Sequence, residues 1–152
     1  MSLETVLLGV GSGETPSMDR LAEAAIDIAG PAGATVALAH VFSEEGYEDT
    51  RERLHFDPDS EVTPDVVAER NVRIRELADQ LADAGVDYTV HGRLAGDGDA
   101  GDRIAEIADE IGADLVIVGG RGRTPAGKAV FGSTAQTVML NASCPVTYVR
   151  EA

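Results

Sequence analysis

Short apolar runs alternate with longer amphipathic stretches along most of the chain. Five of these runs predict buried strands, because they are apolar throughout and are bounded by glycine, proline or polar residues. They cover residues 6–10, 35–41, 86–91, 115–118 and 145–149. Strands that are apolar on both sides are typical of a parallel sheet covered by helices on both faces.

Between the strands, four stretches have the spacing of amphipathic helices. The first begins with the helix-start signal Thr15-Pro16 and is expected to end at Gly30-Pro31. The second begins at Thr63-Pro64 and continues on one apolar face to Gly85. The other two are expected before Gly112 and over residues 134–140.

The predicted order is βαβαβαβαβ, with residues 43–62 interpreted as a surface loop because they are polar, acidic and aperiodic. Right-handed crossovers turn this order into a Rossmann-like, doubly wound α/β sheet of five mainly parallel strands. The chain has 152 residues and shows no repeat or linker, so residues 1–152 are expected to form a single domain.

The charge of the chain is strongly unbalanced. Acidic residues outnumber basic ones by 27 to 12, and the formal net charge is −15. Such a charge repels nucleic-acid phosphates and anionic membranes, so neither is expected as a partner. Lys128 is the only lysine, and this acid-rich, lysine-poor composition resembles that of halophilic proteins more than an ordinary solvated surface.

The targeting and metal-binding signals are weak. There is no signal peptide pattern and no apolar run of about 20 residues, so we expect a cytoplasmic protein. Three scattered histidines and the single Cys144 show no zinc spacing, and His40 is interpreted as a structural histidine at a strand end. Asp97, Asp99 and Asp102 crowd one loop but do not match a calcium loop, which favours solvated acids. No metal site is predicted.

Two glycine-rich turns are candidates for ligand binding, since ligands of such sheets sit beyond the carboxyl ends of the strands. After the first strand, Glu14 and Pro16 break the G-x-G-x-x-G dinucleotide pattern. After the fourth strand, Gly122, Gly127 and Lys128 approach a Walker A pattern. However, alanine follows the lysine where that pattern has a magnesium-binding hydroxyl, so a P-loop is disfavoured.

A wider phosphate-binding pattern overlaps the same stretch. Gly119 and Gly122 would allow a ligand to approach the backbone at the end of the strand. Gly132-Ser133-Thr134 then opens the last helix, where free N–H groups and the helix dipole attract an anion. Arg121 can supply positive charge. An ordinary turn followed by a helix N-cap would give the same spacing, so the residues alone leave both interpretations open.

The segments VLLGVGSGETPS, LAHV, GADLVIVGGRG, FGSTAQTV and CPVTYVR resemble the universal stress protein family over nearly the whole chain. ATP-binding members of that family carry the pattern G-x2-G-x9-G-[ST], which is complete here. The resemblance implies a stress-response protein that binds ATP and signals through binding and conformational change, with the need for magnesium left open. Its implied contacts are Val41 and Val118 for adenine, and Gly119, Arg121, Gly122, Gly132, Ser133 and Thr134 for ribose and phosphates.

One position departs from the family pattern. Many members have an aspartate after the first strand that contacts the adenosine, and Gly11 stands there in this chain. A nucleotide-free structural or interaction module of the same fold is therefore the alternative. The resemblance also implies a homodimer paired through the last strand, around Val146 and Tyr148. No catalytic acid or base can be assigned, so no enzymatic activity beyond slow, incidental ATP hydrolysis is expected.

Overall fold

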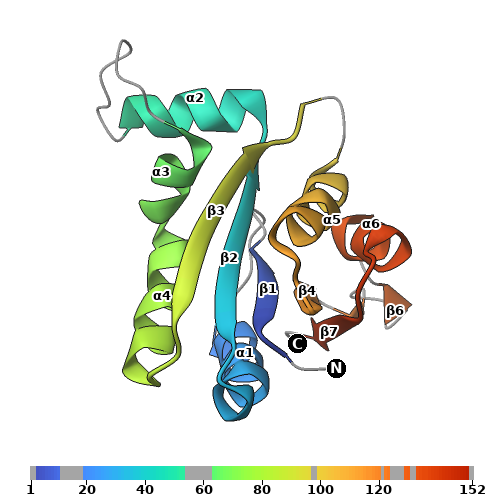
Figure 1. Ribbon diagram of the computed structural model, residues 1–152. Coiled ribbons are helices and arrows are strands. Elements are labelled where there is room, and N and C mark those ends of the chain that lie inside the picture. Colours follow the sequence, from blue (N-terminus) through green and yellow to red (C-terminus); the bar gives the residue numbers. More distant parts are fainter. Residues whose placement is uncertain are drawn as a thin grey trace.

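The computed structural model describes residues 3–10, 19–53, 63–96, 99–120, 122–123, 129–130 and 133–150 (Figure 1). Its helices are α1 (Asp19–Ala32), α2 (Glu44–Arg53), α3 (Pro64–Glu69), α4 (Val72–Asp83), α5 (Ala100–Ile111) and α6 (Ser133–Asn141). Its strands are β1 (Thr5–Val10), β2 (Thr35–Phe42), β3 (Tyr88–Leu94), β4 (Leu115–Gly120), β5 (Gly122–Arg123), β6 (Ala129–Val130) and β7 (Val146–Arg150).

Five strands form one parallel sheet in the order β3-β2-β1-β4-β7, which confirms the predicted α/β, Rossmann-like class. The chain builds outward from β1 through β2 to β3, then crosses to the other side of β1 and adds β4 and β7. The strand order therefore reverses between β1 and β4. A second, two-stranded sheet pairs β5 with β6 in antiparallel register, within the glycine-rich stretch that follows β4.

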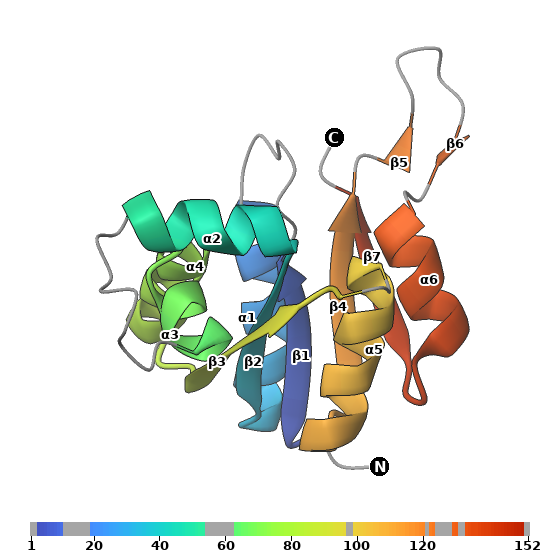
Figure 2. The ribbon, with the colours of Figure 1, turned by 90° about the horizontal axis from the view of Figure 1, so that it is seen from above.

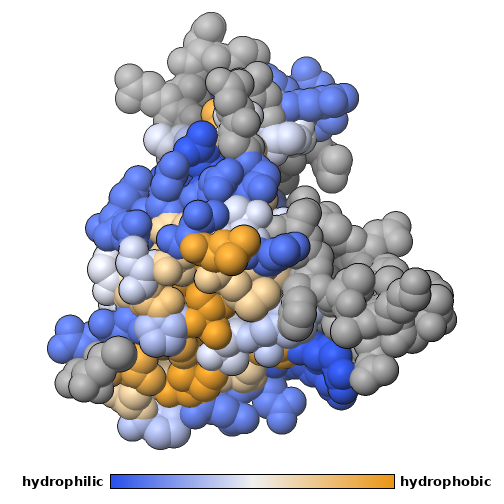
Figure 3. All heavy atoms as spheres, turned by 90° about the vertical axis from the view of Figure 1, so that its right-hand side faces the viewer, coloured by the Kyte–Doolittle hydropathy of each residue, from blue (hydrophilic) through white to orange (hydrophobic). Residues whose placement is uncertain are grey.

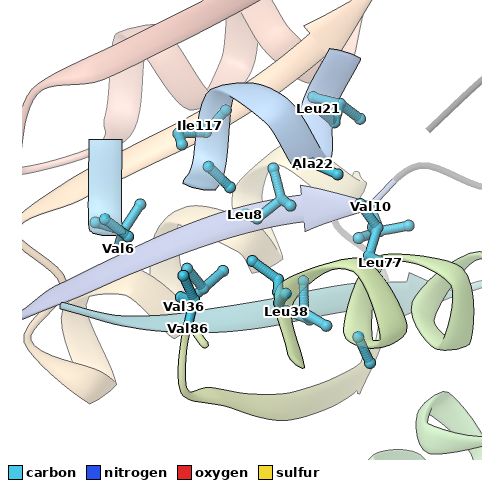
Figure 4. Packing of buried hydrophobic residues seen from close by; sticks show 14 of the residues in the cluster. Val6, Leu8, Val10, Leu21, Ala22, Val36, Leu38, Leu77, Val86 and Ile117 are labelled. Atoms are coloured by element: carbon cyan, nitrogen blue, oxygen red, sulfur yellow. The ribbon is translucent and has the colours of Figure 1, made fainter. Parts of the chain in front are cut away.

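Helices cover both faces of the sheet, with α1 and α5 on opposite sides in Figure 2. Alternate residues of β1 pack into different clusters, since successive strand side chains point to opposite faces. Val6 and Leu8 join residues of α1 and α4 (Figure 4). Leu7 joins residues of α5 and α6. Each fully buried leucine contributes about 2 kcal/mol through the apolar surface it removes from water.

The first helix runs past its predicted end. Gly30 and Pro31 both lie inside α1, and the chain leaves the helix at Gly33, whose φ is 67°. A proline in the last turn removes only one backbone hydrogen bond there. At the C-terminus of α1, the N–H of Ala34 caps the helix by donating to the carbonyl of Ala29 at 3.0 Å. The predicted start at Thr15-Pro16 lies outside the described residues.

The acidic segment after β2 is not the predicted loop over its whole length, because α2 occupies its first half. Ser43 begins that helix by accepting the N–H of Gly46 on its hydroxyl at 3.0 Å. Tyr47 is buried and its ring packs 5.6 Å from that of Phe42. One aromatic anchor and a serine cap thus hold a helix that carries little apolar periodicity.

The next predicted helix is divided into α3 and α4. Thr63 caps α3 as expected, since its side chain accepts the N–H of Val66. Asn71 then interrupts the helix because its side-chain oxygen accepts the N–H groups of Arg73 and Ile74, at 2.9 and 3.3 Å. This is an N-cap of its own, and it starts α4 as a separate helix.

Asp114 ties the starts of β1 and β4 together. Its carboxylate accepts the backbone N–H groups of Glu4 and Thr5 at 2.9 and 3.1 Å. Those two hydrogen bonds lower the pKa of Asp114, because they favour the charged carboxylate.

The lowered pKa of Asp114 gives a pH-dependent prediction. The stability that this carboxylate adds is fully present above its unfolded-state pKa of about 4, and is lost as the pH falls through the lower folded-state pKa. Asp114→Asn is therefore expected to be less stable than the unchanged protein at pH 7, and the difference should shrink below pH 4. Urea unfolding at pH 7 and pH 3 checks this, and an equal difference at both pH values would contradict it.

Candidate functional site

The candidate site lies where β1, β2 and β4 end together. In the register of the sheet, Val10 pairs with His40, and Leu8 pairs with Ile117. The last residues of β1 therefore lie next to the last residues of both neighbours. Because the strand order reverses between β1 and β4, the two glycine-rich turns of the sequence leave the sheet at the switch point, where ligands of doubly wound folds bind.

Two valines form an apolar floor at this edge. Val41 at the end of β2 and Val118 in β4 are 8% and 3% exposed. Both belong to the cluster under α5 and α6, together with Ile104 of α5 and Ala135 of α6. The structure thus places Val41 and Val118 on the same face of the sheet, as a common site requires.

The start of α6 is held against the start of α5. Gly101 lies in the first turn of α5, and a Cβ on it would come within 2.6 Å of the Thr137 Cβ and 2.7 Å of the Thr134 carbonyl oxygen. The Thr137 hydroxyl also donates to the Asp99 carboxylate at 3.1 Å. The position of the first turn of α6 is therefore set by close contact with α5.

The acids of the preceding loop cap a helix. Asp99 is the N-cap of α5 and accepts the N–H of Asp102 at 2.9 Å, while Asp102 accepts the N–H of Asp99 at 3.3 Å. This reciprocal pair is a capping box. The sequence predicted solvated loop acids, whereas Asp99 and Asp102 also cap the helix. Asp97 lies outside the described residues. Within the ranges that the structure describes, no three metal-ligating side chains come together.

His40 is buried beside the site but faces away from the valine floor. Its Nδ1–H donates to the Val10 carbonyl at 2.9 Å, and its ring meets Phe42 edge-on at 4.5 Å. Burial lowers the pKa of His40, so the imidazole is neutral at pH 7. Because side chains alternate along β2, His40 and Val41 point to opposite faces of the sheet. This geometry fits the interpretation of His40 as a structural residue.

Six of the predicted contact residues lie in the described ranges, and of these Val41 and Val118 share one packing cluster. Gly119 is the second-to-last residue of β4, Gly122 begins β5, and Ser133 and Thr134 lie in the first turn of α6. Gly11, Arg121 and Gly132 lie outside the described residues, so their places in the site stay predictions. Sequence reasoning missed the contact of Gly101 with α6, for which the chain carries no local signal.

The rejected Walker A pattern also disagrees with the described part of the stretch. In a P-loop, the residue after the lysine belongs to the start of a helix. Ala129 instead lies in β6, where it pairs with Arg123 of β5. Gly127 and Lys128 are outside the described residues.

Fold and site together define a Rossmann-like α/β protein with a glycine-rich sequence pattern that ends at a helix N-terminus. A sequence model described as the universal stress protein family matches residues 3–150. The chain therefore belongs to the universal stress protein family. Among the helices that the structure describes, none has the length and apolarity needed to cross a membrane.

The chain is also similar to one curated protein, the stress response protein NhaX of Bacillus subtilis (strain 168). The two are 30% identical over 88 residues, which make up 58% of this chain and 47% of NhaX. The matched part thus spans about half the length of that relative.

Solved structures share the fold along the whole chain. The universal stress protein of Archaeoglobus fulgidus has a TM-score of 0.72 at 22% identity, covering 97% of this chain and 98% of that one. A universal stress protein in complex with cAMP has a TM-score of 0.68 at 24% identity, with 100% of both chains covered. The A. fulgidus protein in complex with dAMP also has a TM-score of 0.68, at 19% identity, covering 99% of this chain and 100% of that one.

Proposed function

We propose that this protein binds an adenine nucleotide, preferentially ATP, at the carboxyl ends of β1, β2 and β4, and acts in the stress response through that binding. The proposal rests on the agreement between a sequence pattern and the places in the fold where that pattern begins and ends. The complete G-x2-G-x9-G-[ST] pattern begins at Gly119, at the switch point of the sheet, and ends at Ser133, at the start of α6. Similar structures bound to cAMP and dAMP support the choice of an adenine nucleotide.

In the proposed complex, the chain offers an apolar end and an anion-binding end. The adenine ring is proposed to lie near Val41 and Val118, which are buried at the apolar end of the site. The first turn of α6 supplies backbone N–H groups that no residue within the helix can pair, and the helix dipole adds partial positive charge there. Ser133 and Thr134 belong to that first turn. Contact with the phosphates would change the conformation of residues 119–134, which is the proposed conformational signal.

We also propose that nucleotide binding, rather than catalysis, is the activity. The buried His40 is committed to the Val10 carbonyl and lies on the face opposite Val41 and Val118, so it is poorly placed to serve as a general base. Any hydrolysis of ATP would then be slow and incidental. The cytoplasmic location, the halophilic adaptation and the exclusion of nucleic acid stay predictions from the sequence.

A homodimer through β7 is part of the proposal. Within the described residues, β7 pairs with β4 on one side only, so its other edge is open to a partner strand. Figure 3 shows hydrophobic residues gathered on the face that carries β7 and α6. Val146, Tyr148 and Val149 of β7 are half-buried, and Leu140 at the end of α6 is 77% exposed. Pairing of two β7 edges would cover apolar surface that a single copy leaves in water.

Gly132→Asp tests the site directly, because it adds bulk and negative charge where the phosphates are proposed to bind. We expect the ATP affinity to fall by at least about tenfold, the equivalent of about 1.4 kcal/mol. Isothermal titration calorimetry would measure the affinity, and circular dichroism would verify that the variant is folded. Gly30→Asp is the matched control, since it adds the same charge at an exposed residue of α1 with nothing within 4 Å.

The outcomes separate the two candidate functions. A folded Gly132→Asp variant with unchanged ATP affinity would contradict the proposed site. A folded, unsubstituted protein that binds no nucleotide would favour the alternative, a nucleotide-free interaction module of the same fold.

A further inference from the structure

The outer edge of the sheet at β3 has two different halves. Helix α3 covers the backbone groups of one half (the closed half), whereas the other half borders a hollow (the open half). Within the described residues, β3 pairs with β2 alone. In a parallel strand the N–H and C=O of one residue point the same way, and those of the next residue point the opposite way. The Asp87 carbonyl accepts the N–H of Val36 in β2, so odd-numbered positions face inward. Even-numbered positions, including Tyr88 and Val90, therefore direct their backbone groups outward.

The closed half is at Gly92. Its outward N–H donates to the Asp65 carboxylate at 2.6 Å, and its carbonyl accepts Nη1 of Arg93 at 2.7 Å. Helix α3 lies against the strand so closely that a Cβ on Gly92 would overlap the carbonyl group of Pro64. Both backbone groups are thus paired and covered, which is how natural proteins protect an edge strand.

The open half, at Tyr88 and Val90, borders a hollow of about 420 Å³ between β3 and α4. Figure 1 shows α3 and α4 running alongside β3 on this side of the sheet. Ile74 and Ala78 of α4 are buried at the bottom of the hollow, and Tyr88 is 41% exposed at its margin. The outward N–H and C=O groups of two residues therefore lie next to a space that an additional strand could fill.

The charges around the hollow favour a basic occupant. Glu69 at the end of α3 and Asp79 on α4 are exposed there, with Arg75 as the one basic side chain in the lining. The whole chain carries a net charge of −15. A second copy would bring the same acidic surface against this one, whereas a basic partner would meet opposite charge.

We propose that the edge of β3 from Tyr88 to Val90 is a docking site for an extended, basic segment of a partner protein. The segment would add as a sixth strand to the sheet, hydrogen-bonded to the outward groups of Tyr88 and Val90. On the side of the added segment that faces α4, an aliphatic side chain would lie over Ile74 and Ala78. Basic ones beside it would lie near Glu69 and Asp79. This site is on the opposite edge of the sheet from β7 and does not depend on nucleotide binding.

The test uses a pair of blocked synthetic peptides, Thr-Lys-Thr-Val-Thr-Lys-Thr and the same sequence with glutamate in place of lysine. Titration of the ¹⁵N-labelled full chain is expected to show saturable binding of the lysine peptide, with the largest amide shifts at Tyr88 and Val90. The glutamate peptide is expected to bind at least about tenfold more weakly, because it meets like charge. Equal binding of both peptides, or no saturable binding of the lysine peptide, would overturn the proposal.

Two variants locate the binding site. Asp79→Lys is expected to lower the affinity for the lysine peptide by about fivefold and to raise the affinity for the glutamate peptide. Glu23→Lys is the matched control, since it makes the same charge change at an exposed residue of α1 and is expected to leave both affinities unchanged. Amide shifts that map away from β3 would contradict the proposed location and place the peptide on another surface. Concentration-dependent self-association through β3, without peptide binding, would show that the edge binds a second copy of this chain instead of a basic partner.

Discussion

Gly101→Ala is expected to lower the affinity for adenine nucleotides by about tenfold, although no substituted atom touches the proposed ligand. The added Cβ would lie 2.6 Å from the Thr137 Cβ and 2.7 Å from the Thr134 carbonyl oxygen, so α6 must move away from α5. That movement displaces the first turn of α6, where the phosphates are proposed to bind. Calorimetric titration with ATP would measure the change.

The same substitution is expected to reduce stability. Alanine in a helix is ordinarily better than glycine by about 1 kcal/mol, but the overlap with a backbone oxygen should reverse that gain and cost about 1–3 kcal/mol. Gly30→Ala in α1 is the control, because a Cβ there meets nothing within 4 Å, and it is expected to show only the ordinary helix gain of up to about 1 kcal/mol. If Gly101→Ala kept both the stability and the ATP affinity of the unchanged protein, the α5–α6 contact would have no role in placing the site.

Gly92→Ala is expected to have the second large effect, this time on stability alone. Its Cβ would overlap the Pro64 carbonyl group and approach the Ala68 Cβ to 3.1 Å, so α3 must separate from β3. The separation also strains the 2.6 Å hydrogen bond from the Gly92 N–H to Asp65. We expect a loss of at least about 2 kcal/mol, which corresponds to a fall in the melting temperature of about 4–8 °C for a domain of this length.

Differential scanning calorimetry measures the fall in melting temperature. ATP titration of the same variant shows whether the structural change stays near β3 or reaches the proposed nucleotide site. The proposed nucleotide site adjoins β1, β2, β4 and α6, and β3 lies beyond β2 in the sheet. ATP affinity should therefore stay within about twofold, since distant sites usually act independently. An unchanged melting temperature would show that α3 does not depend on its close fit at Gly92.

The strands were predictable from sequence because their causes are local, whereas the switch point depends on the order of the strands in the sheet. Buried parallel strands are recorded as apolar runs, and the glycine pattern from Gly119 to Ser133 follows directly after one of them. The boundaries that sequence reasoning missed depend on tertiary contacts or on caps that compete with a continuing helix. Tyr47 stabilises α2 by packing against Phe42, and Asn71 divides α3 from α4 by capping.

The candidate site was predictable only in part for the same reason. Val41 and Val118 could be placed at strand ends, but their common face depends on the register of β2 and β4 against β1. The contact of Gly101 with Thr134 and Thr137 joins residues that are far apart in sequence, and no local pattern records it. Packing of α5 on α6 positions the first turn of α6, where the phosphates are proposed to bind.

Direct calorimetric titration with ATP and AMP tests the central proposal most simply. The folded protein would be titrated in molar KCl, with and without magnesium, because high salt screens the self-repulsion of a chain with a net charge of −15. We expect saturable binding of both nucleotides, tighter for ATP because its polyphosphate reaches the start of α6. Absence of saturable binding of either nucleotide by the folded protein would contradict the nucleotide-binding proposal.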